Sequence, residues 1–178
     1  MAYNFLQLTE RARLGLVQYQ ARIPNTSRRM AGAWSNPIRQ DTWTFDFCGF
    51  EGMWCRVRTK ADWSAPFRRP PGAWHLYAPG VQYLERLDRP ELQHEDMWFH
   101  FTVERRNPFF REGLFAALAD PEDLIAPRVR YLYGLQQRGE PAGALVAHGL
   151  FVSILGEIAA AASRGGDGSY KRPWSIRS

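Results

Sequence analysis

The stretch RRPPGAWHLYAPGVQYLERL, from Arg68 to Leu87, contains two Pro-Gly pairs, at positions 71–72 and 79–80. Pro-Gly pairs usually interrupt regular structure, and these two enclose the aromatic, half-apolar run AWHLYA. The spacing therefore predicts one short strand with a turn at each end, followed by a second strand in VQYLERL.

Further short strands are predicted on both sides of this stretch. Positions 14–20 (LGLVQYQ) fit a first strand, and positions 96–103 (DMWFHFTV) fit the last strand of the series. Tryptophans stand at positions 34, 43, 54, 63 and 74, which is about the strand-plus-turn spacing of a small antiparallel barrel or sandwich.

The segment TWTFDFC, over positions 42–48, alternates Trp43, Phe45 and Phe47 with polar residues. This alternation is typical of a half-buried strand. Gly49 and Gly52 are then expected to form a tight hairpin, with MWCRVR as its return strand.

Beyond the last strand the pattern becomes helical. Positions 108–120 (PFFREGLFAALAD) are predicted to form a helix, and Asp120 is expected to cap the next one, which Pro127 would break in two. A long helix is predicted from Pro141 to just before Gly165. The chain is thus mainly β with C-terminal helices: a barrel with its N-terminal arm over 1–105, a helical dimerisation segment over 106–165, and a linker over 166–178.

The long helix is apolar on more than one face, so one face is available after the other packs on the barrel. One stripe at helical spacing favours a helix–helix homodimer interface, with a second helix of the same chain as the other possible cover. The residues assigned to this interface are Leu145, His148, Val152, Leu155 and Ala159.

Composition indicates an ordinary soluble globular protein of 178 residues, without a secretory signal or a predicted membrane span, and a cytoplasmic location is the expectation. All but two of the 23 basic residues are arginines, and the net charge is +5. These arginines are spread along the whole chain, so no DNA-binding stripe is visible in the sequence.

Catalytic and metal-binding patterns are not found in the sequence. Neither Cys48 nor Cys55 belongs to a metal or nucleophile motif, and buried, inert thiols are expected there. The histidines do not show metal-ligand spacing, and His100 is expected to be a partly buried core residue. The carboxylates around positions 85–96 are interpreted as solubilising. We therefore expect no enzyme activity, no metal and no cofactor.

Aromatic residues are more numerous in the strand region than packing alone requires, which favours a small-molecule pocket lined by rings and a few polar groups such as Arg56, His75 and Gln82. The residues assigned to this pocket are Trp98 and Tyr83, followed by Trp43, Trp54, Arg56 and Trp74.

The two Pro-Gly pairs six residues apart, the aromatic Tyr83 and the later MWFHF (97–101) together resemble the ligand-sensing cupin domain of AraC-type transcriptional regulators. The match covers about positions 42–101. The resemblance implies a jelly-roll β-barrel that binds a small effector, for which a sugar is one candidate. An arabinose-binding member of that family has a stacking tryptophan at the position of Trp98. Ala73 and Tyr83 depart from the aspartate and histidine usual in the family, so the resemblance does not identify the effector.

The same resemblance implies helices that hold a homodimer together, and a separate helix-turn-helix domain through which alone the protein would contact DNA. This chain would then be the sensor part only, with effector binding altering how the paired DNA-binding domains sit. Two alternatives remain from the residues: a stand-alone cupin enzyme, such as a sugar isomerase or dioxygenase, and a structural dimerisation module.

Overall fold

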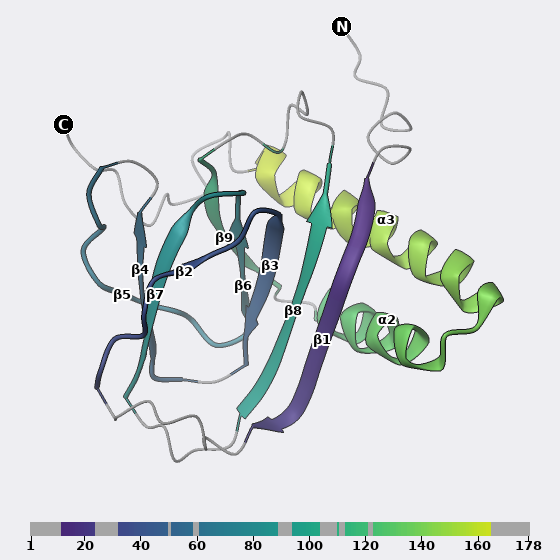
Figure 1. Cartoon of the computed structure of the whole chain (residues 1–178), viewed down its shortest axis with the longest axis horizontal. Coiled ribbons are helices and arrows are strands. Elements are labelled where there is room, and N and C mark those ends of the chain that lie inside the picture. The colour runs from purple at the N-terminus through teal and green to yellow at the C-terminus, as the bar shows by residue number, and fades with distance from the viewer. Residues whose placement is uncertain are drawn as a thin grey trace, which may run out of the picture.

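A computed structural model of the chain describes residues 12–23, 32–49, 51–58, 61–88, 94–103, 110, 113–120 and 123–164. The fold is mainly β: two antiparallel sheets lie face to face, and two C-terminal helices cover one of them (Figure 1). The predicted order, strands first and helices last, is confirmed at this level.

The five-stranded sheet, here called sheet A, has the order β1-β8-β3-β6-β9. Its strands are β1 (Arg13–Ile23), β8 (His94–Thr102), β3 (Trp43–Cys48), β6 (Ala73–Tyr77) and β9 (Phe115–Ala119). The four-stranded sheet B has the order β2-β7-β4-β5. Its strands are β2 (Ile38–Arg39), β7 (Gln82–Leu87), β4 (Met53–Arg58) and β5 (Phe67–Arg68).

Strand pairing follows a simple rule along the chain. The pairs β1·β8, β2·β7, β3·β6 and β4·β5 are all antiparallel, so the first four strands pair with the next four in reverse order. The pairs β3·β8 and β4·β7 complete the sheets, and β9 adds to the free edge of β6.

The hairpin expected at Gly49 and Gly52 is wrong, because β3 and β4 lie in different sheets. Gly52 has a φ of 94°, a conformation that favours glycine, and the chain there crosses from sheet A to sheet B instead of turning back. The sequence pattern identified both strands correctly, but alternation alone carries no information about which strand is the partner.

The strand predicted between the two Pro-Gly pairs is confirmed as β6. Gly72 and Gly80 both have positive φ, 74° and 80°, so each end of the strand turns through a left-handed glycine. The Gly72 amide donates to the Cys48 carbonyl at 2.8 Å, which ties the first turn to the end of β3.

The helix predicted over 108–120 is wrong where the structure describes it, because 115–119 form strand β9. Five consecutive residues of β9 pair with β6, from Phe115 opposite Tyr77 to Ala119 opposite Ala73. Gly113, at a φ of 72°, interrupts any helix just before. Pairing with an open sheet edge outweighs the helical propensity of FAALA.

Helix α2 (Ala126–Arg138) begins later than predicted, and Pro127 lies in its first turn rather than breaking it. The Asp120 carboxylate accepts hydrogen bonds from the amides of Leu124, Ile125 and Ala126, at 2.8, 2.9 and 3.4 Å. Asp120 therefore holds the turn that leads into the helix, as a capping residue does.

Helix α3 (Pro141–Arg164) begins at the predicted proline. Its window from Pro141 to Ala160 is long and apolar enough to cross a membrane by length and composition, with a mean hydropathy of 1.7 and 39% of the window buried. The core helices of soluble proteins pass the same test. Phe151 and Ile154 are fully buried, whereas Leu145 is 77% exposed, so one face of α3 packs on the protein and another does not.

Much of the hydrophobic core lies between sheet A and the two helices, and the same cluster continues between the sheets through Val57, Phe67 and Tyr83. Phe45 stacks on Trp74 with ring centroids 4.6 Å apart, and Phe99 and Phe101 both meet Phe151 of α3 edge to face. One face of sheet A is thereby packed against the helices, and its other face is left to meet sheet B.

Candidate functional site

The face of sheet A that is turned toward sheet B is polar. Directly opposite residues of paired strands share a face, and Asp46 lies opposite both His75 on β6 and Trp98 on β8. Two residues earlier, on the same face of β3, Thr44 lies opposite Tyr77 on β6 and His100 on β8. The polar positions of TWTFDFC thus face the interior between the sheets and not solvent.

Sheet B contributes a matching inner face. On it, Cys55 lies opposite Glu85, and Val57 lies opposite Tyr83. The Tyr83 ring stacks on the Tyr77 ring of sheet A, with centroids 4.1 Å apart. The two sheets therefore enclose a shared interior, here called the inter-sheet site, whose walls combine tyrosines with ionisable groups.

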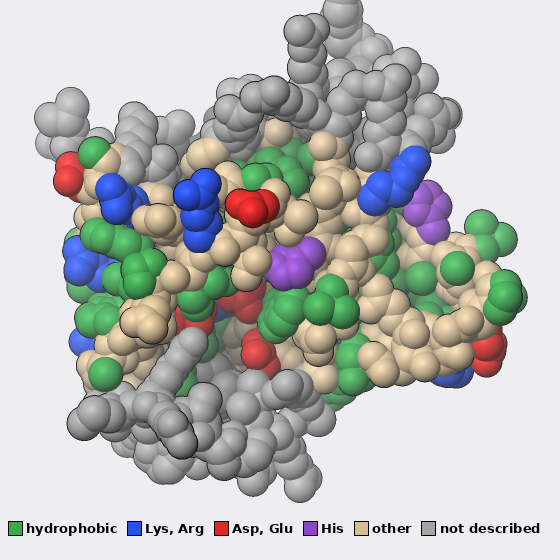
Figure 2. Space-filling model, viewed as in Figure 1, with side chains coloured by type: hydrophobic (Ala, Val, Ile, Leu, Met, Phe, Trp, Pro, Cys, Tyr) green, Lys and Arg blue, Asp and Glu red, His purple; other side chains and the backbone are tan. Residues whose placement is uncertain are grey.

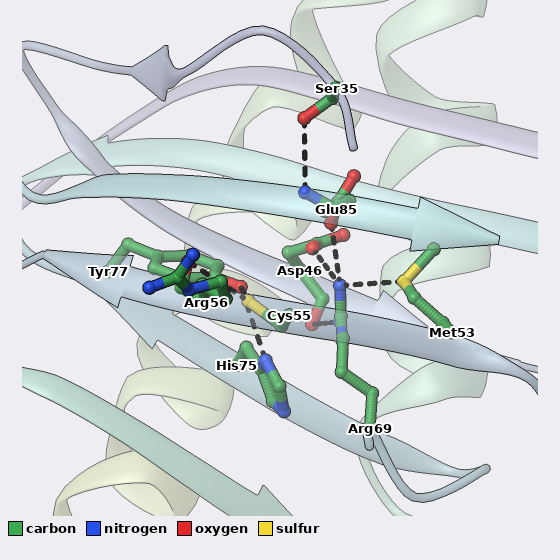
Figure 3. Close-up of polar contacts among 9 residues, drawn as sticks. All are labelled: Ser35, Asp46, Met53, Cys55, Arg56, Arg69, His75, Tyr77 and Glu85. Carbon is green, nitrogen blue, oxygen red and sulfur yellow. Dashed lines mark hydrogen bonds and ion pairs between the residues drawn. The ribbon is translucent and has the colours of Figure 1, made fainter. Parts of the chain in front are cut away.

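Arg69 is the centre of this site. It follows β5 directly and is 1% exposed. Its Nη1 donates to Asp46 Oδ2 at 2.7 Å and to Glu85 Oε1 at 3.0 Å, and it also contacts Met53 Sδ at 3.3 Å (Figure 3). Its Nη2 donates to the Asp46 carbonyl at 3.1 Å. One guanidinium therefore joins a carboxylate of sheet A to a carboxylate of sheet B.

A second group of polar side chains lies beside the arginine (Figure 3). The Tyr77 hydroxyl is 3.2 Å from His75 Nδ1 and 3.7 Å from Cys55 Sγ. Whether His75 Nε2 carries a hydrogen depends on the tautomer that this contact selects. With either tautomer, His75 Nε2 and Arg69 Nε are buried and have no hydrogen-bond partner among the described residues.

Burial sets the charge states in the site. Burial raises the pKa of Asp46 to about 7, against the opposing pull of Arg69. It lowers the pKa of His75 well below its ordinary range, with Arg69 adding to the effect, so the imidazole is neutral. It also raises the pKa of Cys55 to about 12, so the thiol is protonated and unreactive. The site thus places a neutral imidazole and a neutral thiol beside one arginine that two carboxyl groups share.

The interior between the sheets is not sealed. Figure 2 shows a hollow between the strands of sheet A and those of sheet B, with acidic and histidine side chains visible in it. Trp98, opposite Asp46 on β8, is half-buried, as is His100, whose Nδ1 lies 3.0 Å from Thr44 Oγ1. Both side chains thus lie on the inner face of sheet A without being fully buried.

The residues that sequence analysis assigned to the pocket fall in three places. Tyr83 and Trp98 lie on the inner faces of the two sheets. Trp43 and Trp74 lie on the other face of sheet A, in the aromatic core with Phe101 and Phe45. Trp54 and Arg56 alternate with Cys55 and so lie on the outer face of sheet B. Of these six residues, only Tyr83 and Trp98 thus face the interior between the sheets.

The residues assigned to a dimer interface also divide. Leu145 and His148 are exposed on α3, and Val152 is half-buried. Leu155 and Ala159 are buried within the chain itself, at 0% and 3% exposure. The outward part of the predicted stripe is therefore its N-terminal half.

Of the polar residues in the inter-sheet site, sequence reasoning named His75 as a pocket group but did not find Asp46, Arg69, Tyr77 and Glu85. The acids near position 85 were interpreted as solubilising, and for Glu85 this is wrong, because the side chain is buried on Arg69. A usable signal did exist, since an acid within an aromatic strand and an arginine beside a Pro-Gly turn both mark polar groups close to the core.

Two further comparisons bear on the site. Within the described part of the chain, no three His, Cys, Asp or Glu side chains gather as metal ligands. No protein-family model matches the sequence, and no curated protein matches it.

Proposed function

We propose that this chain is the effector-sensing and dimerisation domain of an AraC-type transcriptional regulator, a cytoplasmic protein without enzyme activity. In this proposal a small effector binds in the inter-sheet site, and DNA is contacted by a separate helix-turn-helix domain. The observation that carries it is the buried polar cluster around Arg69, in which His75 Nε2 and Arg69 Nε lack partners among the described residues.

The strand pairing supports a jelly roll. Four strands that pair in reverse order with the next four form one long, folded-over hairpin, and rolling that hairpin produces the two facing sheets of a jelly roll. Cupin domains have this architecture, and small-molecule sites commonly lie in the mouths of β-barrels. The resemblance carried by the Pro-Gly pairs and MWFHF agrees with this topology.

The charges of the site favour an uncharged, polar effector. Two carboxylates, Asp46 and Glu85, already share the single guanidinium of Arg69, so a carboxylate or phosphate ligand would meet net repulsion. Hydroxyl groups can accept from Arg69 Nε and bond to His75 Nε2 with either tautomer, because a hydroxyl both donates and accepts. Sugars and other polyols combine such hydroxyls with faces that stack on aromatic rings such as that of Trp98.

A ligand screen tests the function. Thermal unfolding of the chain is followed with a panel of neutral sugars and polyols and a matched panel of organic acids, at equal concentrations. A ligand that binds the folded state at 100 times its Kd stabilises it by about 2.7 kcal/mol, which raises the melting temperature by several degrees. We expect hits among the neutral compounds only.

Two tryptophan variants test where a compound found in the screen binds. Trp98→Ala should weaken binding about fivefold, since stacking on an aromatic ring contributes on the order of 1 kcal/mol. Trp54→Ala, which removes an indole from the outer face of sheet B, is the matched control and should leave affinity unchanged. Hits confined to the acids, or an affinity that Trp98→Ala does not alter, would overturn this site assignment.

A further inference from the structure

Arginines that are scattered in the sequence gather on the outer face of sheet B. Arg58 lies opposite Gln82, which lies opposite Arg39, and Trp54 lies between Arg68 and Arg86. Arg56 alternates with the inward residues of β4 and shares this face. The outer face of sheet B thus carries arginines from all four of its strands: Arg39, Arg56, Arg58, Arg68 and Arg86.

The four strands of sheet B place no acid on this face. The only acid within the four strands is Glu85, and it points inward to Arg69. Asp88, just beyond β7, lies 3.7 Å from Arg86. Arg39, Arg58 and Arg68 are exposed, and arginine side chains are visible over the sheet B side of the molecule, at the left of Figure 2. Within the four strands, five arginines and no acid thus lie on the outer side of sheet B.

Two tryptophans accompany the arginines. The Arg86 guanidinium lies 5.1 Å from the ring centroids of both Trp34 and Trp54, and Trp54 Nε1 donates to Asp88 at 2.8 Å. These contacts hold the three side chains in a fixed stack, with both indoles half-buried and not covered completely. A positive sheet face with partly open aromatic rings combines the two features that hold a nucleic-acid strand, phosphate contacts and base stacking.

We infer that the outer face of sheet B binds single-stranded nucleic acid through Arg39, Arg58 and Arg68, with Trp34 and Trp54 as stacking surfaces. Arginine suits phosphate because its planar fork donates two hydrogen bonds at once. An open sheet is too broad to enter a duplex groove as a helix does, whereas bases splayed from a single strand can lie flat on it. This activity goes beyond the proposed function, in which DNA binding belongs to another domain.

Fluorescence anisotropy with a labelled single-stranded 20-mer, titrated from 50 to 200 mM salt, tests the inference. Binding should weaken with salt with a log–log slope of about −0.7 for each phosphate neutralised, hence about −2 for the three exposed arginines. Arg39→Gln, Arg58→Gln and Arg68→Gln should each weaken binding several-fold and reduce the slope by about 0.7. Unfolding temperatures close to that of the wild type would show that the variants remain folded.

Arg138→Gln is the matched control, because Arg138 is exposed in the last turn of α2 and its loss makes the same change in net charge. It should leave binding unchanged. Equal weakening by Arg138→Gln would mean diffuse attraction and would overturn the site, as would an absence of binding at 50 mM salt. Tighter binding of a duplex, or equally effective competition by polyglutamate, would replace the single strand with a duplex or an acidic protein as the partner.

Discussion

Arg69 joins the two sheets through Asp46: the guanidinium, at the end of β5 in sheet B, donates to the carboxylate of β3 in sheet A at 2.7 Å. Glu85 shares the same Nη1 at 3.0 Å, so the contact is a buried triad of one cation and two anions. Desolvation makes such a group costly to form and still more costly to leave incomplete.

Arg69→Met should therefore destabilise the protein by about 3–5 kcal/mol, because it leaves two carboxylates buried without their cation. The triple variant Arg69→Met/Asp46→Asn/Glu85→Gln should recover most of that loss, since no uncompensated charge remains. Urea unfolding of the wild type, the single variant and the triple variant measures both steps. If the single variant is as stable as the wild type, the triad does not hold the sheets together.

The raised pKa of Asp46 predicts an unusual pH dependence. The folded carboxyl titrates at about 7 and the unfolded one near 3.8, so the folded state binds the proton more strongly. The stability that this proton contributes is fully present below about pH 4 and is lost as pH rises through about 7. His75 acts in the opposite sense, because its lowered pKa costs stability as pH falls below its ordinary 6.5.

Asp46→Asn separates the two effects. The free energy of unfolding of the wild type minus that of Asp46→Asn should decrease between pH 4.5 and 7, by at most about 1.4 kcal/mol per pH unit. Urea denaturation across this range in both proteins gives the difference directly. A difference that stays constant or increases across this range would show that the pKa of Asp46 is not raised in the folded protein.

Glu95 and Arg130 connect the candidate site to the helices. Arg130 of α2 donates from Nε and Nη2 to the two oxygens of Glu95 on β8, at 2.7 and 2.8 Å, and this pairing lowers the pKa of Glu95. Arg130→Lys keeps the charge but loses the two-pronged geometry. Because both side chains are partly exposed, we expect a loss of no more than about 1 kcal/mol.

Arg128→Lys is the comparison for this pair, since Arg128 makes a single contact of 3.3 Å with Glu157 and should tolerate lysine. Thermal unfolding of both variants, with and without a bound effector, measures the cost. If β8 transmits binding to α2, Arg130→Lys should also reduce the stabilisation that an effector gives, and Arg128→Lys should not. If an effector stabilises the two variants equally, Glu95 and Arg130 do not transmit effector binding from β8 to α2.

The strands themselves were predictable because their signals are local. Strand β6 begins and ends at the two Pro-Gly pairs, where both glycines have positive φ. Trp43, Phe45 and Phe47 share one face of β3, as their alternation indicates. What alternation could not show is that both faces of β3 are buried, one on the helices and one on sheet B. A polar residue in an alternating strand is usually interpreted as exposed, and for this reason Asp46 was not identified as a buried residue.

Contacts between residues that are distant in sequence could not be predicted either. Arg69 meets Asp46 across 23 positions and Glu85 across 16, and nothing local marks either pair. The strand β9 was predicted as a helix for the same reason, since its strand conformation depends on the open edge of β6. Long-range pairing therefore determines which side chains meet in the inter-sheet site. It also explains why β9 forms a strand against its local helical propensity.

The outward face of α3 predicts a homodimer that one substitution breaks. Leu145 is 77% exposed and Val146 45% exposed, although the opposite face of the helix is fully buried. Covering Leu145 contributes about 1.5–3 kcal/mol in each protomer, and a two-fold interface uses it twice, so Leu145→Arg should raise the dimer Kd by about 100-fold or more. Light scattering coupled to size exclusion measures the mass of each protein. Leu16→Arg, at an exposed leucine on β1, is the control and should stay dimeric, so a wild-type monomer or a dimeric Leu145→Arg would contradict the interface.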